Sequence, residues 1–575
     1  MRVVLYFIIL LLGVSPVNAS LLRLEIKGLH GELKENVEGR LSTMDKSTVA
    51  DTPEFKRYLM GEISKGLRAL GYYSPQIQFS VNKIGSMSTL IASVDLGEPV
   101  LIKKITINLS GQGQQDSDYL HLLKNDVPAV GDVLNHGIYD KFKKRLQTLA
   151  MNKGYFDAEV THSELGVAQQ LHQAFWNIDF NTKERYRFGK VIFRDQPIRE
   201  SYLYNIIPFK EGEYYSSEAL SLFNRRLSST NWFNSVSIIP NMAHVNQNKE
   251  IPFYVVATPK KKNIIDMGLG YSTDVGVRTK LGWSKPWLND RGHSIQSNLS
   301  LSKAEQIVTG SYKIPLHRSP LEDYYTLQGG FKHEDNNDTR SDSYNIGIVR
   351  HWDNFDGWQK AIGFNVSYDE FTQANYSYDT FLVYPSFSLY RARQKGELLP
   401  MWGDSQRYSL EISSTALASD INFWRFSTQQ VWIRSLHNYH RFIARANFGI
   451  VDTNNFKRVP PSFRYFAGGD RSIRGYSYQS ISPKDNKGKL LGASRLLSGS
   501  LEYQYNFTGN WWSAMFIDSG EAVNDIRDND FHTGAGAGIR WISPIGPIKM
   551  DIATPIGNGK DGRTVHFYIG IGAEL

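Results

Sequence analysis

The segment from residue 464 to residue 476 contains the residues best suited to specific chemistry in this sequence. It reads Arg-Tyr-Phe-Ala-Gly-Gly-Asp-Arg-Ser-Ile-Arg-Gly-Tyr and ends in Arg474, Gly475 and Tyr476. If the segment folds into an enclosed space, the guanidinium of Arg474 becomes buried and requires carboxylate partners, because a buried charge is costly unless it is paired. Gly475 lets the chain turn beside Arg474, and Tyr476 can stack or form a hydrogen bond. The chemistry indicated is ion pairing that holds a loop in place.

Two downstream acids are the candidate partners of Arg474. Glu502 lies in a stretch that alternates apolar and polar residues, and Asp518 lies in the motif Phe516-Ile-Asp-Ser-Gly520. A fork-shaped guanidinium pairs best with carboxylates that are held in fixed positions. The simpler alternative is that Arg474 forms a stabilising ion pair and has no further role.

The sequence offers no nucleophile and base in an arrangement that indicates an enzyme. Cysteine is absent, which excludes disulfides and thiolate metal sites. His437 and His440 lack acidic neighbours at ligand spacing, so no metal or cofactor is predicted. The run Gly534-Ala-Gly-Ala-Gly538 superficially resembles a phosphate-binding motif, but no helix follows it, and small inward-facing strand residues are the preferred interpretation. A lipase or protease whose residues meet only in space remains an alternative.

The residues beyond Ile264 form about 16 segments of about ten residues, an even number typical of a bacterial β-barrel. One segment alternates apolar Ile362, Phe364, Val366 and Tyr368 with small or polar Gly363, Asn365, Ser367 and Asp369. Lipid outside and water inside would suit both faces. We therefore predict an antiparallel 16-stranded barrel over residues 263–575, whose last segment, His566 to Leu575, pairs with the first.

The alternation of apolar and polar residues that indicates barrel strands stops between Val451 and Leu496. Roughly 45 residues without strand alternation lie there, far more than an ordinary hairpin loop contains. This loop carries the Arg474 segment. Because it is too rich in aromatic residues and glycine for a solvated tail, we expect it to fold back into the barrel lumen.

The first half of the sequence repeats a unit at a spacing of about 80 residues. In each unit an amphipathic helix ends in Gly or Asn before two aromatic residues, and a strand follows, at Leu67 to Tyr73, Leu146 to Phe156 and Leu227 to Phe233. Gly or Asn there suits a left-handed helix cap, and the aromatic residues would fill a small core. Three β-α-α-β-β modules are predicted, over residues 20–98, 99–186 and 187–262. A chance likeness of three amphipathic helices is the alternative.

Residues 1–19 resemble a secretory signal. Arg2 precedes an apolar run from Val3 to Val14, and Val-Asn-Ala precedes the predicted cleavage after Ala19. The apolar run is too short to span a bilayer as a helix.

The net charge of +8 and the isoelectric point near 9.1 would suit binding to a nucleic acid or to an acidic lipid surface. We favour lipid, because an exported chain without a motif that reads nucleic-acid sequence is a poor candidate for nucleic acid.

Two motifs resemble those of the Omp85 superfamily. Arg474-Gly-Tyr476 matches its Arg-Gly-Tyr/Phe loop motif, and Phe516-Ile-Asp-Ser-Gly520 matches its Phe-x-Asp-x-Gly strand motif. Members carry polypeptide-transport-associated (POTRA) modules before a 16-stranded barrel, so the resemblance covers essentially the whole chain. It implies a barrel in the bacterial outer membrane with POTRA modules in the periplasm. One departure is the final Leu575 where many such barrels end in Phe or Trp, so recognition of the last strand would rest on Phe567 or Tyr568.

The resemblance also implies a function without catalysis. The first and last strands would meet at a seam weakened by Gly268, Gly270, Gly570 and Gly572, because glycine-rich strands lose more entropy on ordering. A client strand could pair with the opened edge and leave into lipid. The implied clients are autotransporters and other barrel proteins, and the implied partner is an inner-membrane-anchored protein that meets the first module, roughly Leu21 to Glu98. A passive pore for one secreted partner and a role in lipid transport are the alternatives.

Overall fold

The computed structural model describes residues 22–84, 87–272, 276–353, 357–396, 399–525, 527, 531–543, 546–557 and 564–571. The predicted signal lies outside the described residues, as do residues 572–575, which include Gly572. The chain forms two compact units. The first holds two small modules and part of a third, and the second holds Ile192–Pro208, Leu222–Ile239 and the chain from Tyr254 onward. No helix within the described ranges is long and apolar enough to cross a bilayer.

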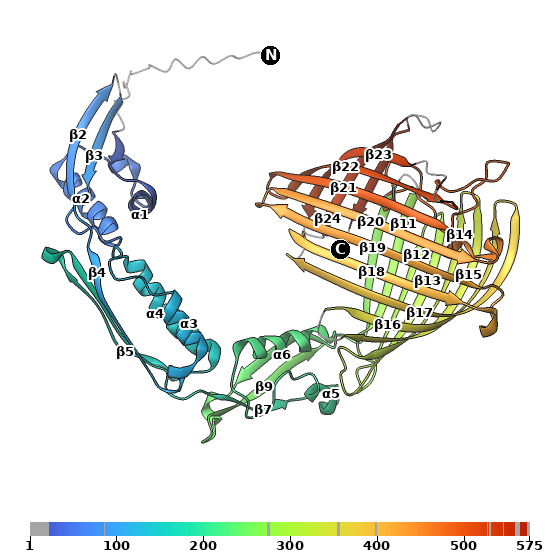
Figure 1. Cartoon of the computed structure of the whole chain (residues 1–575), viewed down its shortest axis with the longest axis horizontal. Helices are drawn as coiled ribbons and strands as arrows, with labels where there is room; N and C mark the ends of the chain where they lie inside the picture. Colours follow the sequence, from blue (N-terminus) through green and yellow to red (C-terminus); the bar gives the residue numbers. More distant parts are fainter. Residues whose placement is uncertain are drawn as a thin grey trace, which may run out of the picture. The chain divides into compact units, whose positions relative to one another are not determined.

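Three modules precede the barrel, and each has the predicted order β-α-α-β-β (Figure 1). The first comprises β1 (Arg23–Lys27), α1 (Gly31–Leu41), α2 (Pro53–Arg68), β2 (Gln76–Ile84) and β3 (Met87–Asp95). The second comprises β4 (Leu101–Ser110), α3 (Ser117–Asn125), α4 (His136–Lys153), β5 (Glu159–Ala168) and β6 (Gln173–Asn181). The third comprises β7 (Arg187–Phe193), α5 (Glu200–Tyr204), α6 (Ser217–Ser229), β8 (Phe233–Pro240) and β9 (Glu250–Pro259).

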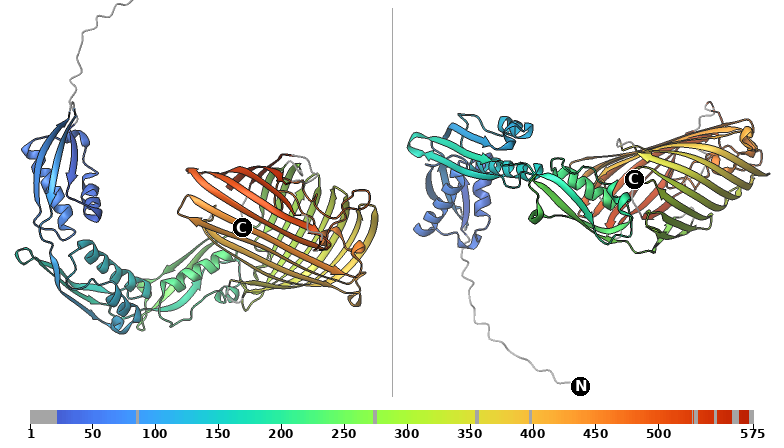
Figure 2. Two further views of the ribbon diagram at one scale, coloured as in Figure 1. Left: turned by 45° about the horizontal axis from the view of Figure 1, so that its top comes forward. Right: turned by 90° about the horizontal axis from the view of Figure 1, so that it is seen from below.

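The sheets of the three modules share one strand order. In each, the last strand lies in the middle, as in β1-β3-β2, β4-β6-β5 and β7-β9-β8. The two helices of the second module lie along the same side of its sheet (Figure 2). Short 3-10 helices span Lys46–Thr48, Gln112–Gln115, Gln169–Leu171, Met242–His244, Thr415–Leu417, Phe456–Arg458 and Pro461–Phe463.

The module helices begin and end where local chemistry dictates. Pro53 opens α2, and the Thr52 side chain accepts a hydrogen bond from the Phe55 amide, which satisfies a free donor of the first turn. The predicted left-handed residues after the helices are confirmed, with φ of +91° at Gly71, +85° at Gly154 and +64° at Asn231. The turns deliver aromatic residues to the interior, and the buried ones are Tyr155, Trp232 and Phe233.

The predicted 16-stranded antiparallel barrel is confirmed, and its sheet is closed in chain order from β10 to β25. Its strands are β10 (Ile264–Ser272), β11 (Gly276–Lys285), β12 (Ser294–Leu301), β13 (Glu305–Pro315), β14 (Tyr324–Asn336), β15 (Thr339–Asp353), β16 (Gln359–Gln373), β17 (Tyr376–Lys395), β18 (Trp402–Ser413), β19 (Phe423–Leu436), β20 (His440–Thr453), β21 (Arg495–Thr508), β22 (Trp511–Val523), β23 (His532–Ser543), β24 (Gly546–Ile556) and β25 (His566–Ile571).

The barrel wall has the two predicted faces. On β16, Ile362 is 53 % exposed and Phe364 48 %, whereas Asn365 is 8 % and Asp369 1 % exposed. The apolar residues therefore point outward and the polar ones into the lumen. Without lipid around the barrel, an outer face of this kind would leave a broad apolar surface in water, which soluble proteins avoid.

Within the second unit, the third module is joined to turns of the barrel. The indole nitrogen of Trp232 donates to the carbonyl of Gly292 at 3.0 Å, and a Cβ on Gly292 would collide with the indole ring. Arg199 binds Asp290 at 2.6 Å, and Arg226 binds Glu322. The link from the third module to the barrel therefore includes ion pairs, a buried indole and hydrogen bonds such as that from the Asn205 side chain to the carbonyl of His317.

Candidate functional site at the luminal loop and the barrel seam

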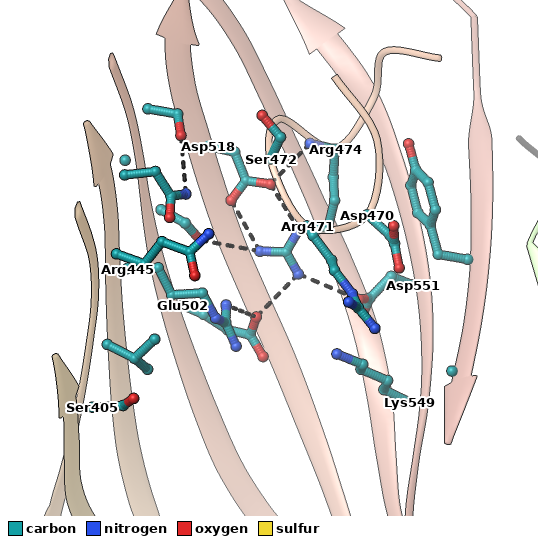
Figure 3. Close-up of a pocket in the computed structure, with 18 of the residues that line it drawn as sticks. Ser405, Arg445, Asp470, Arg471, Ser472, Arg474, Glu502, Asp518, Lys549 and Asp551 are labelled. Carbon is teal, nitrogen blue, oxygen red and sulfur yellow. Dashed lines mark hydrogen bonds and ion pairs between the residues drawn. The ribbon is translucent and has the colours of Figure 1, made fainter. Parts of the chain in front are cut away.

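The luminal loop, residues 454–494, joins β20 to β21 and has a core of its own. Its buried apolar residues pack against the inner wall, and they are Val459, Phe463, Tyr465, Ala467, Ile473, Ile481 and Ala493. Isolated bridges pair Tyr465 with Ala493 and Ala467 with Ile481. The expectation that this loop folds into the lumen is met, because its residues contact inward-facing side chains on many strands (Figure 3).

The loop is also attached to the wall far from the Arg474 motif. The Gln373 side chain donates to the carbonyl of Leu490 at 2.8 Å, and Asp338 accepts from the amide of the same residue at 2.9 Å. Tyr478 donates to Glu305 on β13 at 3.2 Å. The loop is therefore held from both sides of the lumen.

Arg464 holds the loop together in a way that sequence reasoning missed. Its buried guanidinium donates to the carbonyls of Val459 at 2.8 Å, Leu491 at 2.7 Å and Lys457 at 2.8 Å. Carbonyl oxygens thus take the place of carboxylates. Nothing in the local pattern distinguishes Arg464 from a surface arginine, because its partners are backbone groups brought close only by folding.

Arg474 lies between the carboxylates predicted for it, with Asp518 and Glu502 on the wall (Figure 3). Its Nε and Nη2 donate to the two oxygens of Asp518 at 2.7 and 2.9 Å, and its Nη1 donates to Glu502 at 3.0 Å. The Arg474 amide also donates to Asp518 at 3.0 Å. Exposure is 5 % for Arg474, 3 % for Glu502 and 1 % for Asp518, so these charges are almost fully withdrawn from solvent.

Three further charged residues, Asp551, Arg540 and Arg445, belong to the same network and were not predicted. Asp551 on β24 accepts from Arg474 at 3.3 Å and from Arg540 on β23 at 2.5 Å. Arg540 also donates to Glu502 at 2.8 Å, and Arg445 lies 3.4 Å from Glu502. Three arginines therefore balance three carboxylates. The sequence does contain a signal for Arg540 and Asp551. Each is a charged residue between two outward-facing apolar residues, in Ile539-Arg-Trp541 and Met550-Asp-Ile552, and so faces the lumen.

Position 475 requires glycine for two reasons, its backbone conformation and the lack of room for a side chain. Its φ is +99°, and a Cβ would lie 2.8 Å from the carbonyl carbon of Thr554 on β24. Its amide donates to the hydroxyl of Tyr568 at 3.1 Å, and that hydroxyl donates to the carbonyl of Tyr476 at 3.3 Å. The Tyr476 hydroxyl in turn donates to the carbonyl of Thr533 at 3.3 Å. The motif therefore joins the loop to β23, β24 and the last strand.

The glycines of β22 and β23 leave space on the inner face of the barrel wall for groups that pack closely against it. A Cβ on Gly534 would collide with the carbonyl of Arg474, and one on Gly538 would collide with Asp551. The interpretation of residues 534–538 as small inward-facing strand residues therefore explains how the loop approaches so closely. Gly520 acts elsewhere, since a Cβ there would lie 2.7 Å from the Cα of Ser498 on β21 and not against the loop.

Among the described residues, two pairs join β10 and β25 at the seam, Tyr271 with Ile569 and Ser272 with Tyr568. By contrast, β24 and β25 pair through six residues, and β15 and β16 through 15. Inward-facing Tyr568 is buried, whereas Phe567 is 51 % exposed on the outer face. Tyr568 thus contributes its backbone to the seam and its hydroxyl to the loop.

The predicted seam glycines lie beside the pairing and not within it. Gly268 and Gly270 pair with Lys280 and Arg278 of β11, and Gly570 pairs with Lys549 of β24. Gly572 lies outside the described residues. The brevity of the pairing, which no local pattern reveals, is the feature that distinguishes the seam among the described strand pairs.

A cavity of about 700 Å³ opens on the luminal side of the seam. Seam residues Gly270, Ile569 and Gly570 form one part of its lining, and the Arg474 network forms another. Arg471 and Lys549 point into this space (Figure 3).

A family model described as the Omp85 superfamily domain matches residues 262–575. The chain belongs to the Omp85 superfamily. Two further models match its modules, one described as POTRA domain TamA domain 1 over residues 23–96 and one as surface antigen variable number repeat over residues 186–260. This Omp85 protein therefore has its barrel in the outer membrane and its POTRA modules in the periplasm.

Among known proteins, the outer membrane protein assembly factor BamA of Nitratidesulfovibrio vulgaris is 32 % identical over 131 residues, which are 22 % of this chain and 17 % of that protein. The chain thus matches less than a fifth of that relative's length. The crystal structure of BamA from Haemophilus ducreyi lacking POTRA domains 1–3 has the same fold, with a TM-score of 0.65 and 18 % identity over 82 % of this chain and 99 % of that one.

Proposed function

We propose that this Omp85 protein is a non-enzymatic insertase of the TamA type, which assists the assembly and secretion of autotransporters and other β-barrel clients. In this proposal the barrel opens sideways between β10 and β25, and a client strand pairs with the exposed edge. The short pairing of β10 with β25, two residue pairs in the part of the chain that the structure describes, is the observation that carries the proposal. An edge strand in lipid has unpaired backbone groups that cost several kcal/mol each, so an arriving strand gains main-chain hydrogen bonds that lipid does not offer.

The module count supports the TamA type. We take the modules as residues 20–98, 99–186 and 187–262 and the barrel as 263–575, and the TamA model matches the first module. β1 and β2 are the edges of that module's sheet, and an edge can accept a strand from a partner. We infer that a TamB-type, inner-membrane-anchored protein binds the first module. Lipid transport by the pair is a second role that this pairing would permit.

A crosslink across the seam tests the proposal. The chain has no cysteine, so Tyr271→Cys and Ile569→Cys, which lie opposite each other, would supply the only thiols. A cysteine pair at the predicted seam glycines Gly268 and Gly570 would not be opposed, because the seam register, continued by one residue, places Gly570 opposite Gly270. We expect oxidation to abolish assembly of a client autotransporter in reconstituted vesicles and reduction to restore it.

The matched control places the pair within one hairpin. Leu269→Cys and Thr279→Cys lie opposite each other on β10 and β11, which need not separate. Oxidation of this pair should leave client assembly unchanged. If the verified seam crosslink also leaves assembly unchanged, lateral opening is wrong, and a passive pore, measurable as conductance, becomes the better explanation.

A further inference from the structure

Four residues stand at one level across the four strands that flank the seam. Gly270 on β10 is paired with Arg278 on β11, and Gly570 on β25 is paired with Lys549 on β24. If the antiparallel register of Tyr271 with Ile569 is continued by one residue, Gly270 lies opposite Gly570. On the luminal face of the seam, the two glycines therefore lie between two cationic side chains, Arg278 and Lys549.

The glycines let these long side chains approach the seam. A Cβ on Gly570 would lie 3.2 Å from Cε of Lys549, so the lysine stem lies over the glycine. Gly270 likewise leaves the space beside Arg278 free of any side chain. All four residues line the 700 Å³ cavity.

The cavity has more cations than its carboxylates neutralise. Glu502, Asp518 and Asp551 are already bound by arginines of the loop network. Within the described ranges, no ion pair is formed by Arg278, Arg407 or Arg471, which also line the cavity. Arg278 lies 6.0 Å from the ring centroid of Tyr478, and Arg407 lies 4.9 Å from that of Tyr390, which leaves their hydrogen-bond donors available. One acid of the lining, Asp470, offsets part of this excess.

The lining suits a carboxylate on an extended peptide better than a phospholipid. In the described lining of the cavity, the aliphatic residues are Val431 and the outward-pointing Leu269 and Ile569, too few to cover acyl chains. A peptide paired with β10 needs no such surface. Adjacent strands are about 4.8 Å apart, so a strand in place of β25 lies about 10 Å from Arg278, a span that an arginine and an acidic side chain cover together.

We propose that this cavity is an anion site, the seam cradle, in which Arg278, assisted by Arg471, binds a carboxylate of the client strand that pairs with β10. The carboxylate is either an inward-facing acidic side chain or the terminal carboxylate of the strand. The seam cradle rests on the proposed function, because the ligand reaches it by strand addition. Guanidinium groups bind carboxylates through paired, charge-assisted hydrogen bonds, which makes the interaction specific for charge and for position.

Peptide binding to the full chain in lipid nanodiscs tests the seam cradle. Three fluorescent strand peptides are compared: one with an inward glutamate and a free C-terminus, one with that glutamate replaced by glutamine, and one with an amidated C-terminus. We expect one of the two neutralised peptides to bind at least about tenfold more weakly, the effect of losing one charge-assisted hydrogen bond, and so to identify the source of the carboxylate. Binding of the acidic peptide should also weaken with salt.

Arg278→Gln should remove this discrimination, so that all three peptides bind with similar affinity. Arg340→Gln is the matched control, since Arg340 on β15 also forms no ion pair within the described chain and does not line the cavity. It should leave discrimination intact. Each variant is first checked for the folded barrel by its heat-dependent migration in gels.

The outcomes separate the cradle from strand addition. Equal binding of all three peptides to the unaltered protein overturns the cradle and leaves strand addition standing, provided that the oxidised Tyr271→Cys, Ile569→Cys barrel binds none of them. If no peptide binds the unaltered protein, both proposals fail. If Arg278→Gln reduces binding of phosphatidylglycerol vesicles and not of peptides, the assignment to a carboxylate is wrong.

Discussion

Two neighbouring parts of the barrel wall, the strands β21 to β24 and the seam between β25 and β10, differ in how extensively their strands are paired. From β21 to β24, adjacent strands pair through ten to 13 residues, and their inner faces carry the buried network of Arg474, Arg540, Glu502, Asp518 and Asp551. Between β25 and β10, two pairs of described residues join the strands, and Gly270 and Gly570 face the lumen. If the barrel opens sideways as proposed, a stiff wall beside a short seam would confine the opening to the seam. Tyr568, which contacts the luminal loop from the last strand, links the two regions.

The largest expected effect comes from removing the cation at the centre of the wall network. Arg474→Met keeps much of the side-chain volume but leaves Glu502, Asp518 and Asp551 with one cation fewer. Breaking a buried ion pair on one side costs about 3 to 5 kcal/mol, so the barrel should unfold at clearly lower urea concentration. Arg471→Met, three residues earlier and without an ion pair in the described chain, should unfold like the unaltered protein. Equal unfolding of the two variants would show that the network does not hold the wall.

A smaller effect is expected at Gly475. Gly475→Ala adds a Cβ where φ is +99° and where the Thr554 carbonyl carbon is 2.8 Å away. Gly488→Ala in the same loop is the matched control, because φ there is +80° and nothing lies within 4 Å of its Cβ. The shared backbone strain costs about 1 to 3 kcal/mol. We expect Gly475→Ala to lower the urea midpoint further than Gly488→Ala, and equal midpoints would exclude close packing against β24 as the reason for the glycine.

The link between the wall and the seam should show a weaker effect. Tyr568→Phe removes the hydroxyl that accepts from Gly475 and donates to Tyr476, at a cost of about 1 kcal/mol for each hydrogen bond. Hydrogen exchange should therefore accelerate in β25 and stay unchanged in β21 and β22. Unchanged exchange in β25 would show that the loop does not restrain the last strand.

The smallest effect is expected outside the barrel, where an ion pair is less enclosed. Burial tends to raise the pKa of Asp116 in the second module, but hydrogen bonds from Lys153 and the Asp118 amide hold that pKa below its usual 3.8. A lowered pKa in the folded state stabilises the module above pH 3.8, and this stabilisation is lost as the pH falls further. Exchange protection of α3, corrected for intrinsic amide rates, should fall with acidification in the unaltered chain and less in Asp116→Asn. Identical pH profiles would contradict this account.

The fold was predictable because its signals are local. Alternation along β16 and its neighbours follows from the two-residue period of a strand, and Gly71, Gly154 and Asn231 mark helix ends through their tolerance of positive φ. The Arg474 motif was predictable for a related reason, since a guanidinium in an apolar, glycine-rich loop requires acids. The sequence could not identify Asp551 and Arg540 as members of the Arg474 network. Several strands carry inward-facing charged residues, and only the position of the loop decides which of them Arg474 contacts.

The sequence by itself determined the order of elements in the modules, the strand number and the loop that carries a buried arginine. Only the tertiary structure decided that Tyr271 meets Ile569, that Gly270 stands beside Arg278 at the seam, and that Tyr568 binds the loop. The physical reason is the range of the interactions. Periodicity and capping act over a few residues, whereas the pairing of the first and last strands joins positions nearly 300 residues apart, and its length depends on how the whole barrel closes.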